Sequence, residues 1–439
     1  MKTLLRLNKN SSDKDLTSFL DSENDGVFYL GHASILVRLN KKKFLFDFIH
    51  NMNFYKNSWI FFPNQVLDKR LEKVDGIFVS HIHQDHYDPT LLRKFNQLKV
   101  PIYILDGRKN FITNLKKEKI KFKLIPKNKK TFIDNMIWVY GCLHEYNDID
   151  SSLAISNNNL TVYHGNDNFI TEKSLIPFKK KVGRIDIACI PFAYINYYPY
   201  LLNSITRKKM LTEGRRLENL FMNYGIKQSK ILKPKIVIPF GSNLFHIDNP
   251  KCDMNKAVAT PVDFVKYAQK KDKNSKNIYK TILSGDYCLK INNEIICNYK
   301  NISKKEFNNK LINFTLKKRN SIKKYVNKKK IKLNDFIKKE IHKKIKKNPN
   351  KIDHKVVISS KSEKDKKIII NLKNDKVSFL IDKKIPFNSH YFILEDNEFN
   401  LWVRNRLSFE EVLGTRRFRY ERYPNIYQVK INQIYTNYL

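Results

Sequence analysis

The sequence predicts a layered α/β protein with a smaller α+β domain at its C-terminal end. Over the first 300 residues, short apolar runs rich in β-forming residues alternate with segments of helical spacing. Histidine and aspartate residues follow the ends of several of these runs. Near residue 300 the composition changes, and Lys and Asn become dominant. Strands that alternate with helices are typical of helices packed on sheets, and the change in composition marks the end of that region.

Predicted strands and helices follow one another along the first region. The segment Gly26–Phe48 contains β-rich runs broken at Asn40–Lys43, which predicts a hairpin. The apolar run Gly76–Ser80 predicts a strand that leads into a histidine-rich loop, and residues 89–98 have helical spacing. An amphipathic helix is predicted over Glu213–Gly225, ending at a C-cap glycine. Further strands are predicted at 101–106, within 136–169, at 184–193 and at 235–241.

The composition divides the chain into three predicted segments. Residues 1–300 form the layered domain, residues 301–355 a Lys/Asn-rich helical connector, and residues 356–439 the small α+β domain. Within the last segment, residues 366–384 predict a hairpin. Residues 407–418 predict a helix that begins with a serine N-cap and a glutamate three residues later.

The chain is strongly basic, with 84 Lys and Arg against 42 Asp and Glu and a formal net charge of +42. Lysine is spread along the whole chain, so most of the excess is expected on the solvated surface, with a small anionic substrate as the alternative. Dedicated nucleic-acid binding is disfavoured, because it needs basic residues gathered on one face. No membrane span is predicted, since nowhere do about eighteen apolar residues run together.

The five cysteines are scattered, odd in number and without CxxC spacing. This pattern fits a reducing cytoplasm, where we expect the protein to be located, and argues against a structural zinc ribbon. The first residues contain no apolar stretch of signal-peptide length, which agrees with that location. Cys142 is expected to be a small buried residue rather than a thiolate ligand.

The loop "VSHIHQDHYDP" concentrates potential metal ligands. His81 and His83 are two residues apart on an extended segment, so their side chains can point the same way. Asp85 and His86 follow where the chain turns. Imidazole together with carboxylate suits zinc, iron or manganese, and four such side chains in six positions predict a metal site.

One loop cannot supply all the ligands of a two-metal site, so residues at other strand ends are expected to contribute. His144 follows "IWVYGCL", Asp167 follows "LTVYHGN", and His246 comes shortly after "IVIPFG". A single histidine in such a loop is usually a structural residue. The HxHxDH loop changes that expectation, because it predicts a metal centre that needs these further ligands.

This arrangement resembles the metallo-β-lactamase superfamily, in which two sheets flanked by helices form an αββα sandwich. The resemblance implies two divalent metal ions, the first held by His81, His83 and His144, the second by Asp85, His86 and His246, with Asp167 bridging both. It also implies that Asp47 in "FLFDF" buttresses the histidine loop. The sequence departs from the superfamily pattern in three places. The usual Gly-Asp is Gly165-Asn166-Asp167 here, and His164 lies close enough to compete as a ligand. Phe48 replaces the proline that normally follows the buttressing aspartate.

Longer segments are similar to the CMP-N-acetylneuraminate hydroxylases over most of the chain. They include "GHASILVRLNKKKFLFD", "RRLENLFMNYGIKQSKILKPKIVIPFG" and "LSFEEVLGTRRFRYERYPNIY". A Rieske cluster needs a Cys-x-His set paired with a Cys-x-x-His set, and this pair is missing, because Cys142 and His144 form a Cys-x-His set without a Cys-x-x-His set elsewhere in the sequence. If the chain is an oxygenase, the resemblance therefore implies a separate ferredoxin-type electron donor.

The function predicted first is a metal-dependent hydrolase with two zinc ions. Metal-activated hydroxide would attack a small anionic substrate, phosphorylated or similar to a sugar nucleotide, while Asp85 and Asp167 orient the water or carry its proton. The alternative is a diiron monooxygenase that uses iron in the same site. A nuclease and a non-catalytic metal protein are disfavoured.

Three side chains are candidates for substrate binding. Arg215 and Arg216 could hold a phosphate group between them, or form salt bridges on a helix surface. Tyr197 belongs to the tyrosine-rich stretch "PFAYINYYPY", which could line the entrance to the site or serve packing.

Overall fold

A computed structural model describes residues 12–50, 54–145, 149–247, 253–321, 333–349, 351–381, 384–425, 430–431, 434–435 and 439. The chain divides into two compact units. Unit 1 comprises residues 1–54, 59–195 and 215–319, and unit 2 comprises residues 55–58, 196–214 and 320–439. The division near residue 320 falls inside the predicted connector, and unit 2 takes in a mid-chain segment that the sequence placed in the first domain.

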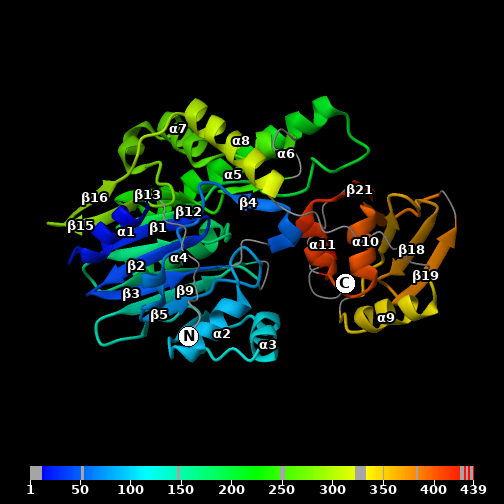
Figure 1. Ribbon diagram of the computed structural model, residues 1–439, viewed down its shortest axis with the longest axis horizontal. Helices are drawn as coiled ribbons and strands as arrows, with labels where there is room; N and C mark the ends of the chain where they lie inside the picture. Colours follow the sequence, from blue (N-terminus) through cyan, green and yellow to red (C-terminus); the bar gives the residue numbers. More distant parts are fainter. Residues whose placement is uncertain are drawn as a thin grey trace. The chain divides into compact units, whose positions relative to one another are not determined.

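Unit 1 contains two main sheets (Figure 1). In sheet order, the eight-stranded sheet consists of β16 (Glu294–Asn298), β15 (Tyr287–Ile291), β1 (Gly26–Gly31), β2 (Ser34–Leu39), β3 (Lys42–Phe46), β5 (Gly76–Phe78), β6 (Ile102–Leu105) and β7 (Lys123–Ile125). The six-stranded sheet consists of β13 (Ile236–Phe240), β12 (Ile187–Pro191), β11 (Thr161–His164), β10 (Ser151–Ser156), β9 (Trp138–Leu143) and β8 (Thr131–Phe132). A small two-stranded sheet pairs β14 (Leu244–His246) with β4 (Trp59–Phe61).

The core of unit 1 lies between the two main sheets and is made of side chains such as Val27 and Ile35 from one sheet and Val139 and Val162 from the other. Helices cover both outer faces. On the eight-stranded sheet these are α1 (Ser12–Asp21), α2 (Pro89–Gln97) and α3 (Lys109–Lys117). On the six-stranded sheet they are α4 (Glu172–Val182), α5 (Arg207–Leu232) and α7 (Pro261–Lys271). The predicted αββα sandwich is therefore confirmed.

The remaining helical segments of unit 1 are α6 (Asp253–Ala257), α8 (Lys304–Ser321) and the 3₁₀ turns at Lys69–Glu72 and Lys273–Ile278. Another 3₁₀ turn, at Phe54–Asn57, lies where the division between the units falls. No helix in the described ranges is long and apolar enough to cross a membrane.

Unit 2 is an α+β domain, as the sequence predicted. Its sheet has the order β19 (Lys376–Ile381), β18 (Lys366–Asn371), β17 (Lys355–Ser360), β20 (Ser389–Leu394) and β21 (Phe418–Tyr423). β17 and β20 are parallel, and the other neighbours are antiparallel. The helices are α9 (Asp335–Ile345), α10 (Asp396–Val403) and α11 (Phe409–Thr415).

The helix predicted to end at Gly225 does not end there. α5 runs through this position to Leu232. Gly225 is buried, and a Cβ atom on it would lie 3.0 Å from the Phe264 ring and 3.1 Å from the Pro191 carbonyl oxygen. The glycine therefore permits close packing and is not a helix cap.

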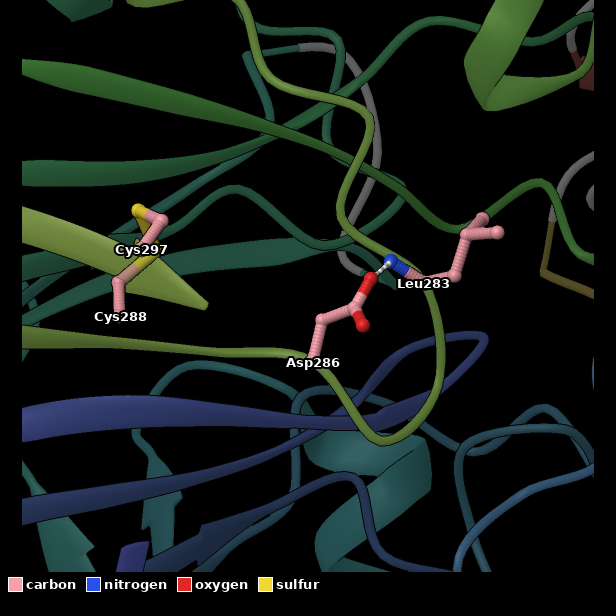
Figure 2. Close-up of a disulfide and its surroundings, with 4 residues drawn as sticks. All are labelled: Leu283, Asp286, Cys288 and Cys297. Carbon is pink, nitrogen blue, oxygen red and sulfur yellow. Dashed lines mark hydrogen bonds between the residues drawn. A yellow bond between two sulfur atoms is a disulfide. The ribbon is translucent and has the colours of Figure 1, made fainter. Parts of the chain in front are cut away.

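A disulfide joins Cys288 on β15 to Cys297 on β16 (Figure 2). The two residues face each other in the antiparallel register of a tight hairpin. The scattered spacing of the cysteines gave no sign of this bond, because the hairpin brings together residues nine positions apart. Cys142 and Cys189 are free and buried, as expected for Cys142, and Cys252 lies outside the described residues.

Candidate metal centre

The loop between β5 and α2 supplies four ligand-type side chains, those of His81, His83, Asp85 and His86. It closes into a turn because the backbone N–H groups of His86 and Tyr87 both donate to the His83 carbonyl oxygen, at 3.0 and 2.9 Å. α2 then begins with Asp88 as its N-cap and a proline in its first turn. The local sequence thus fixes the order strand, turn and helix on which the ligands are mounted.

Among the described residues, two groups of three side chains could each hold a metal ion. Within each group the ligand atoms lie within 4.8 Å of one another. The first group is His81, His83 and Asp167, and the second is His32, Asp85 and His86. Asp167 also lies next to the second group, since its Oδ2 atom is 3.3 Å from His86 Nε2. Asp167 is thus next to both groups, and its bridging role stays a prediction.

His86 Nε2 and the neighbouring carboxylate oxygens converge on one place in the centre. His86 Nε2 lies 3.3 Å from Asp167 Oδ2 and 3.7 Å from Asp85 Oδ2. The same nitrogen is buried and has no hydrogen-bond partner among the described residues. The His86 nitrogen, once deprotonated, and the two carboxylate oxygens form a donor set that a divalent cation can bind.

Asp47 holds the histidine loop through hydrogen bonds to Ser80 and His86. Its Oδ2 atom is 2.9 Å from His86 Nδ1, and its Oδ1 atom accepts from the Ser80 backbone N–H at 2.7 Å. The Ser80 hydroxyl also donates to Asp47. A carboxylate on Nδ1 fixes the imidazole so that Nε2 faces the Asp85 and Asp167 side chains, and the buttressing role of Asp47 stays a prediction.

A second chain of contacts reaches the loop through Arg108, which has no motif signal in the sequence. The buried Arg108 guanidinium donates to Ser151 Oγ at 3.2 Å, and Ser151 Oγ donates to the Ser80 carbonyl oxygen at 2.9 Å. Asn166 Nδ2 lies 3.2 Å from His81 Nδ1 and donates to the Ser151 carbonyl oxygen at 3.2 Å. Asn166 thus supports the first group from the strand end that carries Asp167.

Burial and neighbouring charges set the protonation of the centre. Burial lowers the pKa of His81, and the charges of nearby histidines lower it further, so its ring is neutral. Burial acts to raise the pKa of Asp85, but the charge of His86 and the hydrogen bond from His32 outweigh it and hold the pKa below its ordinary value. Burial acts to lower the pKa of His86, but Asp167 and Asp85 raise it well above its ordinary value. His86 is therefore protonated, and its positive charge balances the two carboxylates. A cation bound here would replace that proton and balance the same charges.

His32 was not among the ligands expected from the sequence. It lies in the turn between β1 and β2, and its Nε2 atom is 3.1 Å from Asp85 Oδ2. Its ring stacks on Phe61 at 4.7 Å. His32 has no other ligand-type residue near it in the sequence, so no motif marks it. It is recognised only in the fold, where the β1–β2 turn lies next to the loop that follows β5.

Neither group contains His144, His246 or His164. The His144 side chain is half-buried, and its backbone N–H donates to the Asp150 carbonyl oxygen at 3.0 Å. The His246 ring packs edge-on against Trp59 at 5.2 Å. His164 Nε2 lies 3.1 Å from the Ala33 carbonyl oxygen. The ligand roles of His144 and His246 stay predictions.

The candidate substrate residues belong to different units of the chain. Arg215 and Arg216 are exposed on α5. Tyr197 belongs to unit 2, where its ring packs against Phe418 at 5.3 Å and Tyr420 at 5.0 Å. These contacts favour packing for Tyr197, and all three substrate roles stay predictions.

Residues 26–212 match the family model described as the beta-lactamase superfamily domain. This match agrees with the resemblance to the metallo-β-lactamase superfamily that the sequence motifs indicated. All six members of the two ligand groups lie inside the matched region, although this region is less than half of the 439 residues. The predicted resemblance to the superfamily is confirmed for this domain.

Curated relatives match parts of this chain. A putative Rieske 2Fe-2S iron-sulfur protein of Mycolicibacterium smegmatis is 27% identical over 197 residues, 42% of this chain and 37% of that protein. The cytidine monophosphate-N-acetylneuraminic acid hydroxylase of Cricetulus griseus is 32% identical over 94 residues, 20% of this chain and 16% of that protein. The chain thus spans well under half the length of these relatives, and the hydroxylase similarity is shorter than the sequence segments suggested.

The solved structures to which the chain is similar at low TM-scores include a hydrolase and a hydroxylase. Igni18, a metallo hydrolase from Ignicoccus hospitalis, is 12% identical with a TM-score of 0.41, covering 63% of this chain and 100% of its own. CmlA, a diiron beta-hydroxylase from Streptomyces venezuelae, is 16% identical with a TM-score of 0.37, covering 57% of this chain and 52% of its own.

Proposed function

We propose that unit 1 binds two divalent metal ions and hydrolyses a small anionic substrate. The observation that carries this proposal is the pair of adjacent ligand groups, with Asp167 next to both. Zinc is the ion proposed for hydrolysis, because mixed imidazole and carboxylate ligands suit it. The cytoplasmic location predicted from the sequence remains part of this proposal.

Two metal ions, when bound, would supply Lewis acidity and lower the pKa of water to about 7. The chain's own carboxylates have separate tasks. The Asp85 side chain is only 10% exposed and is held by the contact with His32. Asp85 would therefore orient the attacking water and would not exchange protons freely with solvent. The Asp167 side chain is 37% exposed, so it is the carboxylate that can accept a proton from the attacking water and pass it to solvent.

The proposed substrate is anionic, such as a phosphodiester or a sugar nucleotide. The net charge of +42 supports this choice, because a positive field raises the local concentration of anions. Arg215 and Arg216 on α5 are the proposed phosphate-binding pair.

A second candidate function is a diiron monooxygenase. The sequence matches favour it, because the relatives that they name are a hydroxylase and a putative Rieske protein. The same histidines and carboxylates would hold iron. Electrons would come from a ferredoxin-type donor outside these 439 residues, since the paired Rieske ligand sets are missing from them.

The decisive experiment measures metal content by mass spectrometry on protein purified without oxygen, together with activity. About two zinc ions per chain and hydrolysis of a phosphodiester or sugar nucleotide, lost on chelation and restored by zinc, would support the hydrolase. About two iron ions and an optical spectrum that changes with dioxygen and reductant would support the monooxygenase. Less than about half an ion per chain would contradict both proposals.

A further inference from the structure

We infer that a cavity of unit 1, outside the metal centre, binds a small primary amine with an apolar body. The cavity has a volume of about 340 Å³ and is lined by residues of α1 and α8 and of the segments before β15 and after β16. Small-molecule sites have volumes of about 300–1,000 Å³, so this cavity suits a small ligand. None of its lining residues belongs to either ligand group, so the inference does not depend on the proposed dinuclear function.

Part of the cavity lining is apolar and buried. The buried side chains of Phe62, Leu283 and Phe307 belong to it. The Phe62 ring packs edge-on against the Phe307 ring, with 5.2 Å between their centroids. A lining of this kind takes the hydrophobic body of a ligand, while a few polar groups fix its orientation. Aromatic rings next to a carboxylate also favour a cationic group, because their faces attract it.

The charged side chains of the lining favour a cation over an anion. Glu306 and Lys310, one turn apart on α8, form an ion pair with 2.6 Å between Oε1 and Nζ. The other charged residues of the lining are Asp15, Asp286 and Lys300. Lys300 is exposed, so water and salt screen its charge. This excess of carboxylate is the reverse of the whole chain, in which 84 Lys and Arg face 42 Asp and Glu.

Asp286 is the carboxylate that a bound ammonium group would contact. Its Oδ2 atom accepts from the Leu283 backbone N–H at 2.8 Å, which holds the side chain in place (Figure 2). Burial and the charge of Asp15 raise the pKa of Asp286 to about 7, so its ionised form lacks a compensating charge. An ammonium group near both carboxylates would supply that charge and favour ionised Asp286.

Two of the cavity walls are tied to each other by a covalent bond. Residues 283–286 lead into β15, and residues 300–302 follow β16. The disulfide joins Cys288, two residues after the first wall, to Cys297, three residues before the second. The two strands also pair along their length. The walls therefore keep their spacing without a ligand, which lowers the cost of ordering the site on binding.

Three probes of the same shape and different charge test the inference. They are 2-phenylethylamine, 2-phenylethanol and phenylacetate, titrated into the full chain at pH 8 and low salt and followed by ligand-observed NMR. Asp286→Asn removes the charge but keeps an acceptor for the Leu283 N–H. Asp25→Asn is the matched control, because Asp25 bonds to Asn157 and Asn159 and does not line the cavity.

Wild type should bind the amine with a dissociation constant below about 1 mM, at least about tenfold tighter than the alcohol or the acid. Asp286→Asn should lose about tenfold in affinity for the amine and keep its affinity for the alcohol, and Asp25→Asn should match wild type. Wild type without saturable amine binding, or with equal affinity for the acid, would overturn the inference. An unchanged amine preference in Asp286→Asn would overturn it as well, because the amine would then bind elsewhere, for example to a metal ion.

Discussion

Asp47 determines which nitrogen of His86 faces the metal position, so its carboxylate controls the centre without touching an ion. Asp47 is buried, and burial acts to raise its pKa. The hydrogen bond and the charge of His86 outweigh burial and keep the pKa below its ordinary value. Asp47 is therefore ionised in the folded protein and can fix the Nδ1–H tautomer of His86.

We expect Asp47→Asn to weaken metal binding by about 10–100-fold, because the amide no longer supplies a charged acceptor to His86. A chelator competition titration measures this affinity. Asp25→Asn is the matched control, since Asp25 is also a buried aspartate but bonds to Asn157 and Asn159. Equal loss in both variants would show a general effect on the fold and contradict the role of Asp47.

At the scale of elements, the sequence correctly predicted the turns and helix starts that depend on a few neighbouring residues. The β2–β3 hairpin turns at Asn40 and Lys41, both at positive φ, as the strand spacing required. α11 begins with the predicted capping box of Ser408 and Glu411. Gly225 was misread because its close neighbours come from distant segments, which no window of sequence contains.

Gly225→Ala is therefore expected to destabilise the protein by about 1–3 kcal/mol, although alanine favours helices. The added methyl group would press on the Phe264 ring and the Pro191 carbonyl oxygen. Urea unfolding measures the change. Asn219→Ala, at an exposed position of the same helix, should leave stability unchanged or slightly raised. A stabilised Gly225→Ala protein would show that the site can relax.

At the scale of the whole molecule, the sequence predicted the layers but not how the chain is shared between the units. The segment 196–214 belongs to unit 2, where Leu202 bridges to Tyr420 near the other end of the chain. His32 was missed for the same reason, since its partners are on another strand end. Within one loop, by contrast, the HxHxDH spacing identified four residues of the two ligand groups.

The pH dependence of global stability should contain a contribution from Asp286. Burial and the charge of Asp15 raise the pKa of Asp286 to about 7, so the folded protein holds a proton that the unfolded chain loses near its ordinary pKa of 3.8. This contribution to stability is present below pH 3.8 and is lost as the pH rises through 7. Asp286→Asn keeps an acceptor for the Leu283 N–H, which is 2.8 Å away (Figure 2).

We therefore expect Asp286→Asn to equal wild type near pH 4 and to be more stable by about 2 kcal/mol at pH 8. Urea denaturation midpoints across this range measure the difference. A constant difference across the range would contradict the assigned titration.

The cross-strand disulfide makes the protein suitable for differential thiol labelling. Cys142 and Cys189 are buried, and burial raises the pKa of the Cys142 thiol to about 12 and that of Cys189 further, so neither forms a reactive thiolate at neutral pH. Among the described cysteines, only Cys288 and Cys297 would therefore become labelled when the native protein is reduced. Alkylation with and without reductant, counted by intact mass, should differ by two labels per chain. The same count made on protein trapped with acid directly from living cells would reveal the redox state of the compartment in which the chain folds.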